Sequence, residues 1–379
     1  MRERMSKTVL NAKRSAIREF SNLAKAKQGC ISLTLGEPDF DTPESISSLI
    51  HTAIENKETH YIANDGDILL REKIAKHEKE TRSLNYESDE IIVTCGATEA
   101  IFTALFGILE AGDEVIIPTP AFVLYEQIVA LLGAKPIFLD ISKSDFQINQ
   151  NELESLINEK TKAIVLNSPN NPTGCILNEE SLKAVYNTVK EKDIFVLCDD
   201  VYCNIAYGQK PTKSFAQFSD IKEKILAVSG FSKTYAMTGW RLGWLMAEKE
   251  IKERLSLVHQ YMVTSTPSLF QRSAAAALDF DNSEMVKTYQ KRRDYVLDRL
   301  NKMGLYYPFP DGAFYVFADI SKFGISSAEF CKRMIDEALL ALTPGSCFGC
   351  EGFVRISYCY SDSVLEEGLN RLERFIKSI

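Results

Sequence analysis

Between residues 90 and 247 the sequence alternates short, continuously apolar runs with longer segments of helical pattern. Strands that are apolar on both faces lie in sheets covered by helices on both sides, and strands alternating with helices form βαβ units. We therefore predict a large α/β domain with a mainly parallel, seven-stranded sheet. Its predicted strands are 91–95, 114–118, 136–139, 163–167, 194–198, 225–229 and 241–247.

The C-terminal part of the chain has a different pattern. Two strand-like segments flank one helical stretch, and an amphipathic helix follows them. Strands and helices that do not alternate regularly favour an α+β arrangement over a parallel sheet. We therefore predict a second, smaller α+β domain. Its predicted strands are 312–320 and 352–359, and its predicted helices are 327–341 and 363–379.

The same patterns give the boundaries of the two predicted domains. The large domain is expected to span residues 45–285. The small domain is expected to combine the N-terminal segment, residues 1–44, with the C-terminal region, residues 286–379. A long, charged helical segment at 284–303 is expected to connect them.

The composition excludes several classes of protein. The chain has 44 Lys and Arg residues against 52 Asp and Glu residues, and this net charge of −8 disfavours binding to a nucleic-acid backbone. No apolar run approaches the roughly 20 residues that span a bilayer. The nine cysteines are scattered through apolar stretches, which is typical of reduced thiols, and the first residues lack a secretory signal pattern. We expect a soluble, cytoplasmic protein that binds neither nucleic acid nor membrane.

Residues able to do chemistry follow four of the predicted strands. In a parallel sheet the loops at the carboxyl ends of the strands meet at one edge, so these residues are expected to converge. Capping or a simple turn explains each segment when it is considered alone. Their convergence favours a binding site instead. The segments are Gly96-Ala97-Thr98, Ser168-Pro169-Asn170-Asn171-Pro172-Thr173-Gly174, Asp199-Asp200-Val201-Tyr202 and Gly230-Phe231-Ser232-Lys233.

These segments belong to a series of motifs that follow one another along nearly the whole chain. The series is Gly36-Glu37-Pro38-Asp39-Phe40, Tyr61-x4-Gly66-x3-Leu70-Arg71, Gly96-Ala97-Thr98-Glu99-Ala100, residues 168–174, residues 199–202, Ser232-Lys233-Thr234-x4-Gly239-Trp240-Arg241-x-Gly243 and Arg355-Ile356-Ser357. It resembles the fold-type I pyridoxal-phosphate enzymes, and specifically the aspartate aminotransferase-like class I/II aminotransferases. The resemblance implies their fold and pyridoxal 5′-phosphate as the cofactor.

The resemblance also implies a role for each residue around the cofactor ring. Lys233 would bond covalently to the cofactor aldehyde and shuttle a proton, which a primary amine can do. Asp199 would face the ring nitrogen and keep it protonated. Tyr202 and Asn171 would hydrogen-bond the ring hydroxyl oxygen, and Phe122 would stack on the ring, with a place in the core as its alternative. The predicted catalytic residues are Lys233, Asp199 and Tyr202.

A second group of residues is implied to hold the cofactor phosphate. Backbone N–H groups at a helix start and a guanidinium both suit a phosphate, because they donate hydrogen bonds and offset its charge. Tyr61 would reach the phosphate of the neighbouring subunit, so the resemblance implies a homodimer with shared sites. The predicted phosphate-binding residues of the subunit itself are Gly96, Ala97, Thr98, Ser232 and Arg241.

The substrate site is implied by the same family. Arg355 matches the residue that binds the substrate α-carboxylate, assisted by Gly36 and Asn171; a structural ion pair is the alternative for Arg355. A dicarboxylic substrate would need a second cation that the sequence does not place. An apolar pocket would slightly favour aromatic or other neutral amino acids. Its candidate residues are Phe20, Phe40 and Tyr125.

The predicted activity is transfer of an α-amino group from an L-amino acid to a 2-oxo acid, with these small molecules as the partners. A carbon–sulfur β-lyase of the same fold is the nearest alternative, although those relatives usually have His at the position of Asn170. A catalytically silent, cofactor-binding regulator is another. The single Cys347-x-x-Cys350 motif lacks the second ligand pair of a zinc site, so no metal is expected.

Overall fold

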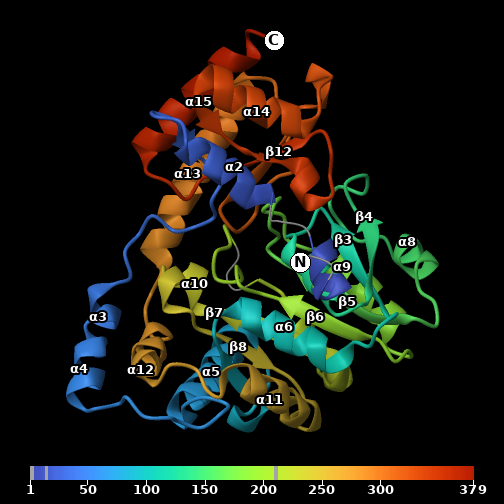
Figure 1. Cartoon of the computed structure of the whole chain (residues 1–379), viewed down its shortest axis with the longest axis vertical. Coiled ribbons are helices and arrows are strands. Elements are labelled where there is room, and N and C mark those ends of the chain that lie inside the picture. The colour runs from blue at the N-terminus through green and yellow to red at the C-terminus, as the bar shows by residue number, and fades with distance from the viewer. Residues whose placement is uncertain (1–3, 13–15, 209–211) are drawn as a thin grey trace.

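The structure is a computed structural model that describes residues 4–12, 16–208 and 212–379 (Figure 1). Residues 1–3 and 13–15 of the predicted small domain, and 209–211 of the predicted large domain, lie outside the described residues. Within the described ranges, no helix combines the length and apolarity needed to cross a membrane. All nine cysteines carry free thiols.

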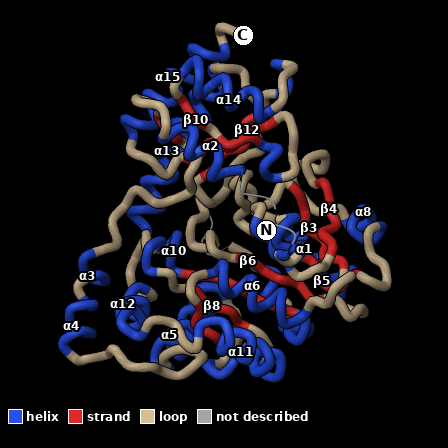
Figure 2. Tube along the Cα trace, viewed as in Figure 1, coloured by secondary structure: helices blue, strands red, loops and turns tan. Residues whose placement is uncertain are grey.

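A seven-stranded sheet forms the lower part of the molecule in Figure 2. Its order is β2-β8-β7-β6-β5-β3-β4, and every neighbouring pair is parallel except those that involve β8. This confirms the predicted mainly parallel sheet. The strands are β2 (Ile91–Thr94), β3 (Glu114–Thr119), β4 (Lys135–Asp140), β5 (Thr161–Asn167), β6 (Phe195–Asp199), β7 (Ile225–Gly230) and β8 (Gly243–Met246).

Helices cover both faces of this sheet, which explains why its strands are continuously apolar. Successive side chains of a strand point to opposite faces, so Ile92 packs into one apolar cluster while Ile91 and Val93 pack into another. The first cluster includes α6 (Ala97–Ile108), α7 (Leu124–Leu131) and α11 (Lys249–Val263). The second includes α5 (Ile68–Arg82), α9 (Glu179–Val189) and α12 (Ser268–Ala277).

The C-terminal region forms a separate, three-stranded antiparallel sheet in the order β11-β12-β9. The N-terminal segment joins this region, because β1 (Ile31–Ser32) pairs in parallel with β10 (Leu340–Ala341). The predicted helix at 327–341 is too long: α14 ends at Ala338, because Leu339 takes a left-handed conformation (φ 53°) and the chain then enters β10. The remaining elements here are β9 (Tyr315–Asp319), β11 (Thr343–Pro344), β12 (Phe353–Ser357), α14 (Ser327–Ala338) and α15 (Asp362–Ile376).

A long helix, α13 (Ser283–Lys302), runs between the two regions (Figure 1). On the N-terminal side, α2 (Ala16–Lys25) lies against α14. The other helices are α1 (Lys7–Asn11), α3 (Glu44–Ser47), α4 (Leu49–Glu55), α8 (Gln150–Ser155) and α10 (Phe231–Thr234), with 3₁₀ turns at Ser88–Glu90, Phe215–Gln217, Ser219–Lys224, Thr238–Trp240, Ser321–Phe323 and Gly345–Phe348.

Candidate active site

A cavity of about 250 Å³ lies at the carboxyl ends of the parallel strands, where the chain leaves β5, β6 and β7. Because neighbouring parallel strands end at the same edge, side chains from distant parts of the sequence meet there. Tyr125 of the expected apolar pocket lines this cavity, and so do eleven of the residues to which the resemblance assigns a role. They are Gly36, Ala97, Thr98, Phe122, Asn171, Asp199, Tyr202, Ser232, Lys233, Arg241 and Arg355.

Asp199, the last residue of β6, provides a buried carboxylate at the cavity wall. The side chain of Tyr125 donates a 2.6 Å hydrogen bond to its Oδ2, and the backbone N–H of Val201 donates to Oδ1 at 3.3 Å. Burial raises the pKa of Asp199 to about 6, and these two hydrogen bonds oppose that rise. The carboxylate is therefore poised to respond to a cationic partner near neutral pH.

Lys233 reaches the cavity from α10, the short helix that follows β7. Its Nζ donates a 2.7 Å hydrogen bond to the backbone carbonyl of Gly36. Burial lowers the pKa of Lys233 to about 8. A larger fraction of this amine is consequently neutral at pH 7–8 than for an exposed lysine, and the neutral amine is the form that attacks carbonyl groups.

The start of α6 and Arg241 form a site suited to an anion. Gly96 has φ 80° and immediately precedes the helix, whose first N–H groups lack partners within the helix. The Arg241 guanidinium lies so close that a Cβ on Gly96 would sit 2.6 Å from its Nη2. Arg241 itself has φ 55° and lies outside β8, so the predicted strand at 241–247 begins too early. Thr98 and Ser232 add hydroxyl groups to the same wall.

Arg355 lies on β12, is buried and lines the cavity. Its Nη1 donates to Oδ1 of Asn171 at 2.7 Å, and its Nη2 donates to the backbone carbonyl of Thr34. The rings of Tyr315 and Phe348 lie 4.5 and 4.9 Å from its central carbon. Within the described part of the chain its Nε has no hydrogen-bond partner. Because Arg355 lines the cavity, its guanidinium can donate to an arriving carboxylate.

Aromatic side chains make up much of the remaining wall. Phe122 is partly buried and meets the Tyr125 ring edge-on, with centroids 6.2 Å apart. The hydroxyl groups of Tyr202 and Tyr315 are hydrogen-bonded to each other at 2.7 Å. Tyr202 can thus offer or accept a hydrogen bond toward the cavity while its ring stays fixed by packing.

Four of the predicted residues do not line this cavity. Phe20 and Phe40, which were expected in an apolar substrate pocket, pack instead against the apolar core of the smaller region. Gly96 lies beneath the wall, where it allows the approach of Arg241. Tyr61 is 88% exposed and borders a separate groove beside α5 and α12. The structure of one chain therefore does not bring Tyr61 to the residues around its own Lys233.

Sequence reasoning missed three polar residues of the site. Tyr125 was expected only as part of an apolar pocket, but its hydroxyl binds Asp199. Asn167, the last residue of β5, donates to the backbone carbonyl of Asp199 at 3.0 Å and could have been found by the strand-end rule. Tyr315 gives no local signal, because it reaches Tyr202 from the other sheet.

The donor set fits pyridoxal phosphate. The cofactor carries an aldehyde, a protonatable ring nitrogen and a phosphate. The cavity offers an amine of lowered pKa in Lys233, a buried carboxylate in Asp199, and the α6 start with Arg241 for the anion. One cavity wall thus holds a partner for each of the three groups.

Comparison with known proteins agrees with this fit. The family described as aminotransferase class I and II matches residues 28–372. A probable N-acetyl-LL-diaminopimelate aminotransferase of Bacillus subtilis is 40% identical, covering 96% of this chain and 93% of that protein. An aspartate aminotransferase of Pyrococcus abyssi is 41% identical, covering 96% of both chains.

A solved structure supports the same assignment at the level of the fold. The crystal structure of an aromatic aminotransferase from Pyrococcus horikoshii superimposes with a TM-score of 0.89 at 40% identity, covering 95% of this chain and 99% of that one. Sequence family, relatives and fold agree over nearly the whole length. The chain therefore belongs to the class I and II aminotransferases of fold-type I, and it is a pyridoxal-phosphate-dependent enzyme that transfers amino groups between small amino and oxo acids.

Proposed function

We propose that the cavity at the ends of β5, β6 and β7 is the active site of this aminotransferase, with Lys233, Asp199 and Arg355 in its three main roles. The observation that carries the proposal is the placement of the Lys233 amine in the same cavity as the buried Asp199 carboxylate. The cavity combines a lysine and a carboxylate with an anion site and a separate guanidinium. A cavity with a purely structural role would not need these four different groups.

Pyridoxal phosphate, when bound, supplies an aldehyde and an electron-withdrawing ring. Lys233 Nζ would bond to the cofactor in the resting enzyme and would carry the proton that leaves the α-carbon of the amino acid. The Asp199 carboxylate would hold the ring nitrogen in its protonated form. Tyr202 and Asn171 would orient the ring hydroxyl, and Phe122 would pack on the ring face.

The phosphate end of the cofactor would be held by the α6 start. N–H groups of Ala97 and Thr98 would bind it together with the side chains of Ser232 and Arg241. The helix contributes a partial positive charge there, and the guanidinium contributes a full one. Gly96 would keep the two close to each other.

We also propose that the amino acid is aromatic or otherwise neutral. Arg355 would bind its α-carboxylate beside Gly36 and Asn171. The other cations that line the cavity are Lys233 and Arg241, and each has a role toward the cofactor. The lining of the described chain thus provides no second cation for a side-chain carboxylate, whereas it does provide apolar side chains. These are Ile17, Leu35, Ile101, Leu124 and Val201.

Two further features belong to this proposal. The protein would be a homodimer in which Tyr61 completes the partner's phosphate site; Tyr61, Leu69 and Tyr261 are large apolar side chains that a single chain leaves exposed.

The chain would divide into a large domain, 45–285, and a small domain formed by 1–44 and 286–379, since β1 joins β10. The cytoplasmic location stays a prediction.

Replacing Lys233 with alanine tests the proposal directly. The wild-type protein should show a visible absorbance band of bound cofactor and convert an aromatic amino acid and 2-oxoglutarate to products. Lys233→Ala should lose at least a thousandfold in rate while its far-UV circular dichroism is unchanged. Lys222→Ala, at a partly exposed lysine paired with Glu90, is the control and should keep both properties. A Lys233→Ala variant with normal turnover would refute the proposal.

A further inference from the structure

Two acids stand side by side where β6 ends, and only the first of them faces the cofactor cavity. Asp199 lines the cavity, whereas the Asp200 side chain is bound by Arg82 and by the hydroxyl of Ser214, at 2.7 Å. Neighbouring side chains in an extended chain point to opposite sides, so the two carboxylates diverge. The sequence pair Asp199-Asp200 thus places one acid in the cavity and the other in the core.

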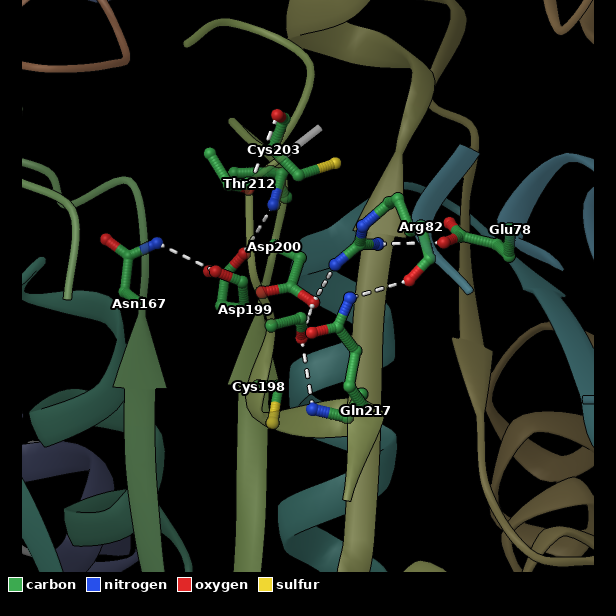
Figure 3. Close-up of polar contacts among 12 residues, drawn as sticks. Glu78, Arg82, Asn167, Cys198, Asp199, Asp200, Cys203, Thr212 and Gln217 are labelled. Carbon is green, nitrogen blue, oxygen red and sulfur yellow. Dashed lines mark hydrogen bonds and ion pairs between the residues drawn. The ribbon is translucent and has the colours of Figure 1, made fainter. Parts of the chain in front are cut away.

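Arg82 is a buried cation in an unusual place. The buried face of α5 consists of Leu70, Ile74, Glu78 and Arg82, so a stripe that begins apolar ends in two charged residues. The side chains of Glu78 and Arg82 are each 1% exposed, and Arg82 Nη1 donates to Glu78 Oε2 at 2.8 Å. Its Nη2 binds Asp200. Figure 3 shows Arg82 between Glu78 and Asp200, with Asn167 on the opposite side, next to Asp199.

The ion pairs of Arg82 affect the electrostatic environment of Asp199. Arg82 pairs with the carboxylates of both Glu78 and Asp200, and the charge of Asp200 adds to the effect of burial in raising the pKa of Asp199. Without the guanidinium, the charge of Asp200 would act on Asp199 without the cation that now binds it. A carboxylate next to uncompensated anions takes up a proton more readily, and a protonated Asp199 could no longer hold a cationic ring nitrogen.

We infer that Arg82 is a positioning residue for the cofactor site: it binds Asp200 on the far side of β6 and offsets its charge, so that Asp199 alone presents an ionised carboxylate to the ring nitrogen. The inference rests on the role proposed above for Asp199. Arg82 itself touches neither cofactor nor substrate in this arrangement; it acts through Asp200.

Most of the other titratable groups around these residues stay neutral between pH 5 and 9. His77 on α5 is an exception, because it faces Glu78 and Arg82 and burial lowers its pKa below the usual 6.5. Asp199 is faced by Tyr125 from α7, by Lys233 from α10 and by Cys198 from β6. The pair Arg82 and Asp200 is faced by Cys198, Cys203 and Tyr86 as well as Glu78. Burial raises the pKa of Cys198, Cys203, Tyr86 and Tyr125, so these groups stay neutral between pH 5 and 9.

The test compares two ligands of the cofactor-free protein over that pH range. One is pyridoxal phosphate, and the other is its analogue with a C–H group in place of the ring nitrogen. Both carry the same aldehyde and phosphate, so the ratio of their dissociation constants isolates the contact with Asp199 and cancels the titration of Lys233. Wild-type protein should prefer pyridoxal phosphate, and the preference should be lost on the acid side at a measurable midpoint pH.

Opposite charge changes should move this midpoint in opposite directions. Arg82→Met should raise it by about one pH unit, and Asp200→Asn, which leaves Arg82 paired with Glu78, should lower it. The double variant should return toward the wild-type value, and Arg82→Lys should retain it. Should Arg82→Met fail to fold, Asp200→Asn decides alone: a lower midpoint supports the inference, and an unchanged or higher one overturns it.

A purely structural role for Arg82 predicts another result. Both ligands would then bind more weakly by the same factor and the midpoint would stay in place, which would overturn the inference. Wild-type protein that binds the two ligands equally at every pH would instead refute the proposed contact of Asp199 itself. The two failures are therefore distinguishable.

Discussion

The hydroxyl group of Tyr125 donates a 2.6 Å hydrogen bond to Oδ2 of Asp199, which joins the first turn of α7 to the end of β6. Both side chains are buried, and burial raises the pKa of Tyr125, so its hydroxyl remains a donor throughout the working pH range. The bond orients the carboxylate at the cavity wall and favours its ionised form.

Tyr125→Phe should weaken cofactor binding in a pH-dependent way. In the wild-type protein the hydrogen bond from Tyr125 lowers the pKa of Asp199. Without this bond the pKa of Asp199 should rise further above about 6, so that less of the carboxylate is ionised at pH 7. A hydrogen bond to a charged group contributes about 1.5–3 kcal/mol, so we expect roughly tenfold weaker binding of pyridoxal phosphate at pH 7. The loss of cofactor affinity should be smaller at pH 9, where Asp199 is ionised in both proteins.

Titration of the cofactor-free protein with pyridoxal phosphate measures this effect. Tyr207→Phe is the matched control, because Tyr207 is also buried but its hydroxyl donates to the backbone carbonyl of Ala313, away from the cavity. A deficit of equal size in both variants, or one independent of pH, would contradict the assigned role of Tyr125.

Arg355→Leu should affect the amino acid far more than the cofactor. The guanidinium contacts Asn171 and Thr34 and lines the cavity, so its removal deletes the fork for an α-carboxylate. We expect KM for the amino acid to rise by about 100-fold, from a lost bidentate ion pair, while the dissociation constant of pyridoxal phosphate changes less than threefold. Steady-state kinetics and cofactor titration provide the two numbers.

Arg293→Leu is the control for Arg355. Arg293 is also buried and packs over the Tyr207 ring, but it does not line the cavity. It should lower thermal stability and leave KM for the amino acid unchanged. Loss of cofactor affinity in Arg355→Leu, parallel to the loss of turnover, would point to a structural role for Arg355 instead.

Gly96→Ala should weaken the phosphate site by displacing Arg241. An added Cβ would lie 2.6 Å from Arg241 Nη2, and the residue has φ 80°. Gly112→Ala is the control. Gly112 also has a positive φ, 99°, which an alanine rarely adopts, but a Cβ added there would have no atom within 4 Å. Both variants should lose about 1–2 kcal/mol of stability, yet only Gly96→Ala should bind inorganic phosphate and pyridoxal phosphate at least tenfold more weakly. Equal phosphate affinity in the two variants would exclude the proposed contact.

Mixed dimers should reveal whether Tyr61 acts across the interface. Tyr61→Phe and Lys233→Ala subunits should each form poorly active or inactive homodimers. If Tyr61 serves the partner's site, a mixed dimer contains one site with an intact Lys233 and an intact Tyr61, so activity should reappear on mixing and refolding. If Tyr61 served its own subunit, no mixed site would be complete and activity would stay low. Turnover per dimer, measured against the unmixed proteins, separates the two cases.

The sequence predicted those parts of the structure that depend on local pattern. The apolar runs predicted all seven strands, and Ile91 and Ile92 show the cover on both faces by packing into different clusters. The edge strand β4 is the exception, with Phe138 49% exposed. Two errors lay at element ends, since α14 stops three residues early at the left-handed Leu339 and Arg241 precedes β8; the short strands β1, β10 and β11 were not predicted. Termini are set by individual backbone conformations, which periodicity does not record.

The candidate site was predictable where a motif follows a strand and unpredictable where a partner comes from elsewhere. Asp199 and Lys233 lie at strand ends, so the rule for parallel sheets brings them together. Tyr125 lies 74 residues from Asp199, and Arg82 lies 118 residues from Asp200. The local sequence around Arg82 resembles that of an exposed helix end, and nothing in it indicates a buried cation.

The amino-acid sequence alone determined the layered α/β architecture and the order of the chemical groups along the strands, because both follow from hydrophobic periodicity and from short motifs. The tertiary structure alone decided which carboxylate of the Asp199-Asp200 pair faces the cavity, which tyrosine bonds it and which arginine offsets its neighbour. These choices depend on which helices pack against each side of β6, and that packing is set by contacts between residues far apart in the chain.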